Sequence, residues 1–189
     1  WPSPISPISL SQGKGLNAPA WDGDGKTLVW LEGRSDQGVL VSACADGQAP
    51  RDLTTDLSVR ARVGYGGGDF TVARGNVYFI SGGRIYRQAL ASGSARPLTP
   101  AFGEAASPQV SPNGRWLLYV YSYERQDGLA IVDTDGSLWP QKLASGNDFY
   151  MQPVWHPNGQ QVAWVSWNHP QMPWDGTMLN LARLSVDGV

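Results

Sequence analysis

The chain has 189 residues, of which 23 are Gly and 14 are Pro, and it carries 9 Trp, 7 Tyr and 4 Phe. Breakers at this density leave little room for long helices, which excludes helix bundles and coiled coils, while the aromatic content excludes general disorder. The formal net charge of -2, from 14 Lys and Arg against 16 Asp and Glu, argues against a nucleic-acid partner.

The N-terminal tail, residues 1–16, has no basic region followed by an apolar stretch, so no secretory signal is predicted. Residues 5–10 of this tail are a candidate strand of a further sheet. No apolar run in the sequence approaches the roughly 20 residues that a membrane helix needs, and we expect no membrane partner.

Four segments share one pattern, in which a polar turn that ends in Gly separates an apolar residue from a short apolar strand. They are residues 21–30, 70–79, 110–119 and 155–164, of which the second is a degenerate copy. Their anchoring glycines recur at intervals of 50, 39 and 45 residues, at Gly25, Gly75, Gly114 and Gly159. Asp, Asn and Pro beside such glycines favour turns, so we assign these residues to turn formation and not to catalysis.

Each segment is followed by a second apolar strand that ends in a small turn, as at Asp135-Gly136, and then by a short outer strand. The outer strands are expected at residues 51–54, 96–99 and 141–144. Asp-Gly between apolar runs is a strong hairpin signal, and four-stranded sheets repeated at about 45 residues are propeller blades. The predicted fold class is all-β, a partial β-propeller of about three and a half to four four-stranded blades.

The expected blades are residues 17–60, 61–104, 105–149 and 150–189, after an N-terminal strand or tail at 1–16. The predicted propeller is incomplete at the C-terminus, because the sequence stops just after Asp187-Gly188, before an outer strand. Closed propellers have about four to eight blades, and an open stack exposes strand edges that pair with other chains. We therefore expect a part of a longer protein, with self-association through the open blades.

Motifs that carry chemistry are mostly missing: the sequence has no nucleophile elbow, P-loop, zinc-protease motif or Rossmann fingerprint. The Gly-rich run 64–68 is assigned to close strand packing. The run 22–25 departs from an EF-hand loop at Thr27 and Gly33. Cys44 is the single cysteine, which permits no internal disulfide or thiolate cluster, and its apolar surroundings predict a core position. No metal and no cofactor are expected.

Three residues remain as candidates for contact with a ligand. Glu124 and Arg125 form a charged loop between two predicted strands, for which a solvated hairpin tip is the alternative interpretation. His169 lies among aromatic residues, with a purely structural role as its alternative. His156 occupies a repeat position held by a turn residue in another unit and is assigned to a turn.

Segments outside the repeat resemble a known family. They are residues 1–6, 29–34, 62–70 and, most distinctively, 167–177, which read WNHPQMPWDGT. In this order they resemble the β-propeller of prolyl oligopeptidase family serine peptidases, in the bacterial branch of dipeptidyl and acylaminoacyl peptidases. The repeats alone also fit TolB-like propellers.

This resemblance implies an N-terminal propeller that covers a C-terminal α/β-hydrolase domain with the catalytic Ser, Asp and His. No part of the chain matches the catalytic domain, so no catalytic residue is carried over. The family's propeller admits short peptides, excludes folded proteins, and in some members sets charged residues against a peptide terminus. Glu124, Arg125 and His169 are the substrate-binding candidates for that role here.

The favoured function is therefore a non-catalytic propeller that gates substrate access to a hydrolase domain outside this chain. The parent protein would be a serine peptidase, and the chain alone is expected to be inactive. The alternative is a binding-only, TolB-like module that recognises a protein or ligand. A stand-alone propeller lyase or lactonase would need clustered central ligands, which His156 and His169 do not supply. A single cysteine is compatible with a reducing compartment, so a cytoplasmic location is expected, with the periplasm as the alternative.

Overall fold

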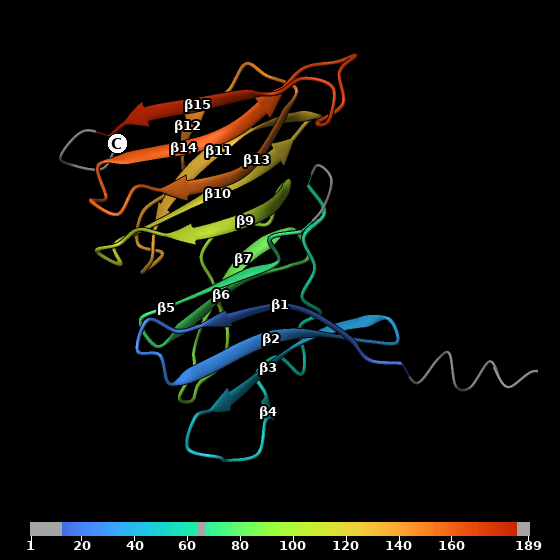
Figure 1. Ribbon diagram of the computed structural model, residues 1–189, viewed down its shortest axis with the longest axis vertical. Coiled ribbons are helices and arrows are strands. Elements are labelled where there is room, and N and C mark those ends of the chain that lie inside the picture. Colours follow the sequence, from blue (N-terminus) through green and yellow to red (C-terminus); the bar gives the residue numbers. More distant parts are fainter. Residues whose placement is uncertain (1–12, 64–66, 185–189) are drawn as a thin grey trace, which may run out of the picture.

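The computed structural model describes residues 13–63 and 67–184, which form four antiparallel β-sheets (Figure 1). The first sheet contains β1 (Gly15–Trp21), β2 (Thr27–Arg34), β3 (Gln37–Cys44) and β4 (Arg51–Asp52). The second contains β5 (Phe70–Ala73), β6 (Asn76–Ser81), β7 (Arg84–Ala89) and β8 (Arg96–Pro97). The third contains β9 (Glu104–Val110), β10 (Trp116–Tyr123), β11 (Gln126–Asp133) and β12 (Gln141–Ala144). The fourth contains β13 (Phe149–Trp155), β14 (Gln161–Trp167) and β15 (Met178–Arg183).

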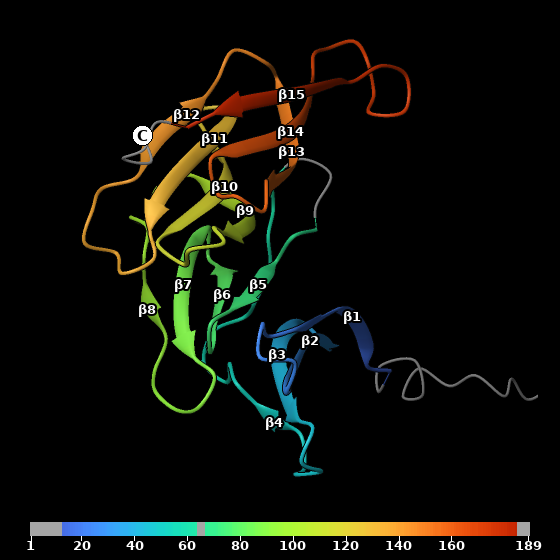
Figure 2. The ribbon, with the colours of Figure 1, turned by 60° about the vertical axis from the view of Figure 1, so that its left-hand side comes forward.

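Within each sheet every strand pairs with the next strand in the sequence. The first strands of successive sheets, β1, β5, β9 and β13, contact one another, so the sheets stack like blades beside a common axis (Figures 1 and 2). The prediction of an all-β, partial β-propeller is confirmed. The described part of the chain contains no helix, and hence none that could cross a bilayer.

The repeated turns form as the sequence predicts. All four anchoring glycines have a positive φ, from 66° at Gly25 to 79° at Gly114, a conformation that glycine adopts without steric cost. In the first turn the Asp24 carboxylate accepts a hydrogen bond from the Lys26 amide at 2.8 Å. In the fourth, His156 Nδ1 accepts one from the Asn158 amide at 3.2 Å, which confirms His156 as a turn residue.

The first strands of three sheets carry a feature that the repeat analysis did not predict. Ala18, Ser107 and Gln152 have φ values of 50°, 52° and 51°, and the pairing register shifts beside each of them in β1, β9 and β13. Each is followed by a proline, which cannot donate to the ladder and is tolerated at a β-bulge. The recurring Xaa-Pro pair is the sequence signal that could have revealed these bulges.

The core lies between the sheets. One cluster fills the space among the second, third and fourth sheets and includes Ile80, Leu117 and Leu129. A second cluster, which includes Val29 and Phe79, joins the first and second sheets. These side chains are fully or almost fully buried, and burial of each contributes about 1.5–3 kcal/mol. Strands such as β10 are apolar along both faces because each of them is covered by a sheet on either side.

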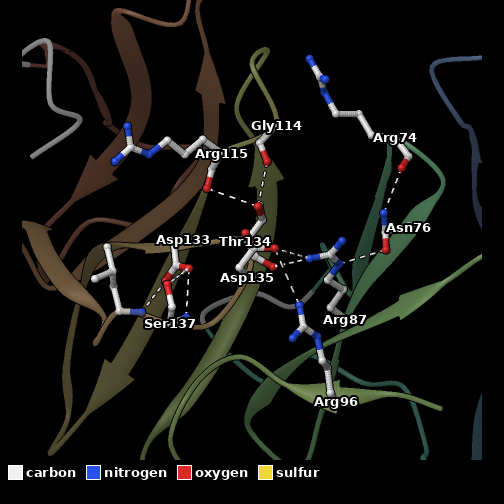
Figure 3. A network of polar contacts seen from close by, with 11 residues as sticks. Arg74, Asn76, Arg87, Arg96, Gly114, Arg115, Asp133, Thr134, Asp135 and Ser137 are labelled. Atoms are coloured by element: carbon white, nitrogen blue, oxygen red, sulfur yellow. Dashed lines mark hydrogen bonds and ion pairs between the residues drawn. The ribbon is translucent and has the colours of Figure 1, made fainter. Parts of the chain in front are cut away.

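Polar contacts also connect each pair of neighbouring sheets. The Gly75 amide donates to Asp22 Oδ2 at 2.8 Å between the first and second sheets. Arg87 Nη1 donates to Asp135 Oδ1 at 2.8 Å between the second and third (Figure 3). Trp155 Nε1 donates to the Gln109 carbonyl at 2.9 Å between the third and fourth. These contacts hold neighbouring sheets in a fixed position relative to one another.

Two packing predictions had opposite outcomes. Cys44 was expected in the core and is exposed, because it is the last residue of β3 and lies past the buried stretch of that strand. Of the two described glycines of the run 64–68, Gly68 is crowded, because a Cβ there would lie 2.4 Å from Ser107 Oγ and 2.6 Å from Ser107 Cα, whereas a Cβ at Gly67 would meet no atom within 4 Å. The predicted strand at 5–10, residues 64–66 of the Gly-rich run and the turn at Asp187-Gly188 lie outside the described residues.

Candidate functional site

The three predicted candidates lie on one side of the molecule, where the second and third strands of each sheet are connected. We call this side the hairpin face. It consists of the tips at residues 34–37, 81–84 and 123–126 and of the longer connection 168–177. Its first and last members are on the right-hand side of Figure 1. The repeat turns that end in Gly occupy the opposite side.

Glu124 and Arg125 form the two-residue turn between β10 and β11. Their φ values of 51° and 62° are both positive, as in a type I′ turn that matches the twist of a hairpin. Both side chains are exposed. The prediction that these residues form a hairpin tip is confirmed, and whether they contact a ligand stays a prediction.

A buried acid lies directly behind this tip. Asp127 pairs with Ser122 across the β10–β11 hairpin and is buried. Burial raises the pKa of Asp127, and a hydrogen bond with Ser122 opposes that rise. The exposed tip is therefore a pair of opposite charges above a carboxyl group that binds its proton more tightly than usual.

His169 follows β14 and is held by its backbone and its ring. Its amide donates to Asp148 Oδ2 at 2.8 Å, and the Asp148 amide donates to Asn168 Oδ1 at the same distance. The imidazole packs edge-to-face on Phe149 at 4.8 Å between ring centroids, and Phe149 stacks on Trp167 at 5.1 Å. The His169 side chain is exposed but sits on a fixed aromatic support.

The connection after His169 is organised by its own turns. The Asp175 amide donates to the Met172 carbonyl at 2.9 Å, and the Met172 amide donates to Asp175 Oδ2 at 3.1 Å. The Gln171 amide donates to the Asn168 carbonyl at 3.1 Å. These hydrogen bonds give the segment a defined shape, and no contact joins His169 to the Glu124–Arg125 tip among the described residues.

The first sheet contributes an ion network to the hairpin face. Arg34 donates to both carboxylate oxygens of Asp52 at 2.6 and 2.7 Å and, through Nε, to Glu32 at 2.7 Å. Trp30 Nε1 also donates to Glu32, at 3.1 Å. The hydrogen bonds from Arg34 hold the pKa of both Glu32 and Asp52 below their ordinary values. Residues 29–34 supported the family resemblance, but the sequence did not show that they form an ion network.

The described residues contain no hydrogen-bonded pair of a histidine and a nucleophilic side chain. Neither His156 nor His169 is hydrogen-bonded to a serine or cysteine side chain in residues 13–63 and 67–184. In the same ranges no three His, Cys, Asp or Glu side chains are grouped so that they could hold a metal ion. The arrangement on the hairpin face can bind or orient a ligand through charge, hydrogen bonds and aromatic contact.

Sequence reasoning missed one further group of side chains. Tyr123, the last residue of β10, and Phe102 and Trp139, from the connections before β9 and β12, line one cavity. These three residues follow no repeat period, so the sequence contained no pattern that relates them.

Comparison with known proteins places the chain beside two groups. No family model matches it. Over its whole length it is similar to puromycin hydrolase (29% identity, TM-score 0.84) and to a puromycin-hydrolysing peptidase of Mycobacterium tuberculosis (28% identity, TM-score 0.83), and it covers 33% of each of those chains. It therefore spans about a third of the length of these peptidases.

The second group is TolB. The Tol-Pal system protein TolB of Nitrosococcus oceani is 43% identical over 51 residues, which are 27% of this chain and 12% of that protein. TolB of Acinetobacter baumannii shares the fold, with a TM-score of 0.68 at 12% identity. The predicted resemblance to the propeller portion of a prolyl oligopeptidase family peptidase is confirmed, as is the resemblance to TolB-like propellers.

Proposed function

Because the chain matches the propeller part of peptidases over its whole length, we propose that it is the non-catalytic propeller part of a serine oligopeptidase. The observation that carries this proposal is that the whole chain matches one third of the length of each puromycin-hydrolysing peptidase. On this proposal an α/β-hydrolase domain elsewhere in the same polypeptide supplies the acyl-transfer chemistry of Ser, His and Asp.

We propose that the hairpin face is the side turned toward the hydrolase domain and that it limits access to short peptides. The support is the position of residues 167–177, the segment most distinctive of the family, on this face. The same face carries Glu124 and Arg125 on the third sheet and His169 after β14 of the fourth sheet. Opposite charges at the tip offer a carboxylate for a peptide ammonium group and a guanidinium for a peptide carboxylate.

The test of this gating role uses the natural full-length protein. Arg125→Gln is expected to raise KM several-fold for peptides with a free C-terminal carboxylate and to leave C-terminal amides unchanged. Arg51→Gln, an exposed arginine on β4, is the matched control. Equal effects of Arg125→Gln on acids and amides would refute a role in binding the peptide terminus. We propose that the full-length protein prefers dipeptidyl or acylaminoacyl substrates. Its rates with chromogenic substrates of these two classes and with puromycin measure that substrate preference.

A binding-only role is the second candidate, and the 43% identity to TolB over 51 residues favours it. Such a module would recognise a protein or ligand with no hydrolase domain attached. A fluorophosphonate probe, which labels active serine hydrolases, separates the two candidates when it is applied to the natural protein.

We also propose that the isolated chain self-associates through its fourth sheet. Leu179 and Leu181 on β15 are 81% and 68% exposed, and Val154 on β13 is half exposed. Ala163 pairs with both Val154 and Leu181, and Val165 pairs with Leu179, so these apolar side chains form one continuous face. A contiguous exposed apolar surface of this kind is typical of a protein–protein contact.

A further inference from the structure

Three aromatic rings gather beside the third sheet. The Phe102 ring packs edge-to-face against Tyr123, with 5.4 Å between centroids, and lies 6.3 Å from Trp139. Phe102, Tyr123 and Trp139 are 53%, 44% and 70% exposed. Single exposed aromatic residues are ordinary on a protein surface, whereas here the Phe102 ring joins two others that are distant in the sequence, and the three form a defined patch. We call these three residues the aromatic cluster.

A cavity of about 150 Å³ opens beside the aromatic cluster. Its lining includes the three rings, Tyr121, and the charged residues Glu104 and Lys142. A site of this volume holds several water molecules, and it therefore admits a compact chemical group but not a folded partner.

The wall of the cavity carries one acidic and one basic side chain, Glu104 and Lys142, which form no ion pair with each other. Glu104 Oε2 is covered from solvent and has no hydrogen-bond partner among the residues that the structure describes. Within the same residues Glu104 forms no ion pair, while Lys142 Nζ lies 5.6 Å from the centroid of Tyr121. An ammonium group of the protein thus already rests on one ring of this cavity, at the distance typical of a cation–π contact.

We propose that this cavity binds a methylated ammonium group carried by a small molecule. Aromatic faces attract such cations, which are large and weakly hydrated. The Glu104 carboxylate adds a favourable field in a partly desolvated site, but its covered Oε2 is not placed to accept a hydrogen bond from the ligand. A primary ammonium group would lose hydrogen bonds to water without replacement, so methylation favours binding here.

The proposal is independent of the peptidase role, because choline and its analogues are expected to bind this chain whether or not a hydrolase domain is present. Choline is titrated into the full chain and binding is followed by the shift of the Trp139 indole N–H resonance, assigned by its loss in Trp139→Phe. The neutral carbon analogue 3,3-dimethylbutan-1-ol tests the charge, and ethanolamine tests the methyl groups. Choline is expected to bind about tenfold more tightly than either analogue, which corresponds to a net contribution of about 1.4 kcal/mol from the cation–π contact and the charge.

Three substitutions locate the site. Trp139→Ala and Glu104→Gln are each expected to weaken choline binding about three- to tenfold, and Lys142→Met is expected to strengthen it because a competing cation is removed. Trp174→Ala, at a residue 72% exposed on the connection 168–177, is the matched control and should leave binding unchanged. Circular dichroism verifies that each variant is folded.

Several results would overturn the proposal. Equal binding of choline and its neutral analogue would show that only apolar contact matters, and equal binding of ethanolamine would show that the rings do not contribute. Undiminished affinity in Trp139→Ala would place the site elsewhere. Cosedimentation of the chain with phosphatidylcholine vesicles, together with no response to free choline, would assign the site to a lipid surface and contradict the small-molecule ligand.

Discussion

Arg87 and Asp135 lie 48 residues apart in the sequence and join two neighbouring sheets: Arg87 Nη1 donates to Asp135 Oδ1 at 2.8 Å. The same guanidinium donates to the Thr134 carbonyl at 3.0 Å and, through Nε, to Asn76 Oδ1 at 2.9 Å (Figure 3). Arg87 of β7 therefore binds the turn after β11 and stabilises the contact between the second and third sheets. We call this contact the seam.

Arg87→Met is expected to lower the free energy of unfolding by about 1–2 kcal/mol, because three hydrogen bonds are lost at a partly buried seam. Asp135→Asn should lower the free energy of unfolding by only about 0.5 kcal/mol, since the Asp135 side chain is 77% exposed and solvent screens its ion pair with Arg87. Urea denaturation measures both values. Arg51→Met, on the exposed strand β4, is the control, and an equal loss of stability in that variant would contradict the seam account.

Gly68→Ala is expected to destabilise the chain by about 3 kcal/mol, because the new Cβ would clash with the backbone of Ser107. The φ of Gly68 adds strain, and Gly25→Ala isolates that contribution, since Gly25 has a φ of 66° but open space around it. The control should lose about 1 kcal/mol. Thermal or urea unfolding compares the two variants, and an equal loss would show that crowding at Ser107 is unimportant.

The ion network of the first sheet predicts that the free energy of unfolding depends on pH in the acidic range. The hydrogen bonds from Arg34 hold the folded-state pKa of Glu32 and Asp52 below their ordinary values, so both acids bind protons more weakly in the folded chain than in the unfolded chain. Their stabilising contribution is complete above the ordinary carboxyl pKa of about 4 and is lost as the pH falls through the lowered values. Urea midpoints measured from pH 6 to pH 2.5 should fall less steeply for Glu32→Gln than for the unaltered chain. Asp36→Asn, in the neighbouring turn, is the control, and an unchanged slope in Glu32→Gln would refute the prediction.

The apolar face of the fourth sheet predicts self-association of the isolated chain. Replacing Leu179 and Leu181 together by Lys should shift the sedimentation profile toward monomer, because two large exposed side chains are lost from the continuous face. Leu138→Lys, at a leucine 45% exposed in another connection, is the control. A strictly monomeric unaltered chain at high concentration would contradict the prediction.

The fold could be predicted where local turn chemistry decides the structure. Gly25 and Gly159 anchor turns whose conformation depends on a few adjacent residues, and the apolar strands after them need cover on both faces, which stacked sheets provide. Cys44 was misplaced because an apolar run does not show where the buried part of a strand ends. The bulges, such as that at Ser107, were not predicted because an Xaa-Pro pair also fits a turn or the end of a strand.

The candidate site was only partly predictable for a different reason. Glu124 and Arg125 were correctly expected at a hairpin tip, since that depends on neighbouring residues alone. The contact of Phe102 with Trp139 and the hydrogen bond between Asp148 and His169 join separate connections. Such pairings depend on how the sheets stack, and a single sequence contains no local pattern for them.

The most direct test of the central claim is to isolate the natural protein with an antibody against this chain and treat it with a fluorophosphonate probe. We expect one labelled polypeptide about three times as long as this chain, since the chain covers 33% of the similar peptidases. The purified chain alone is expected to remain unlabelled and not to hydrolyse peptides. An unlabelled natural protein, or serine-inhibitor-sensitive hydrolysis by the chain alone, would contradict the central claim.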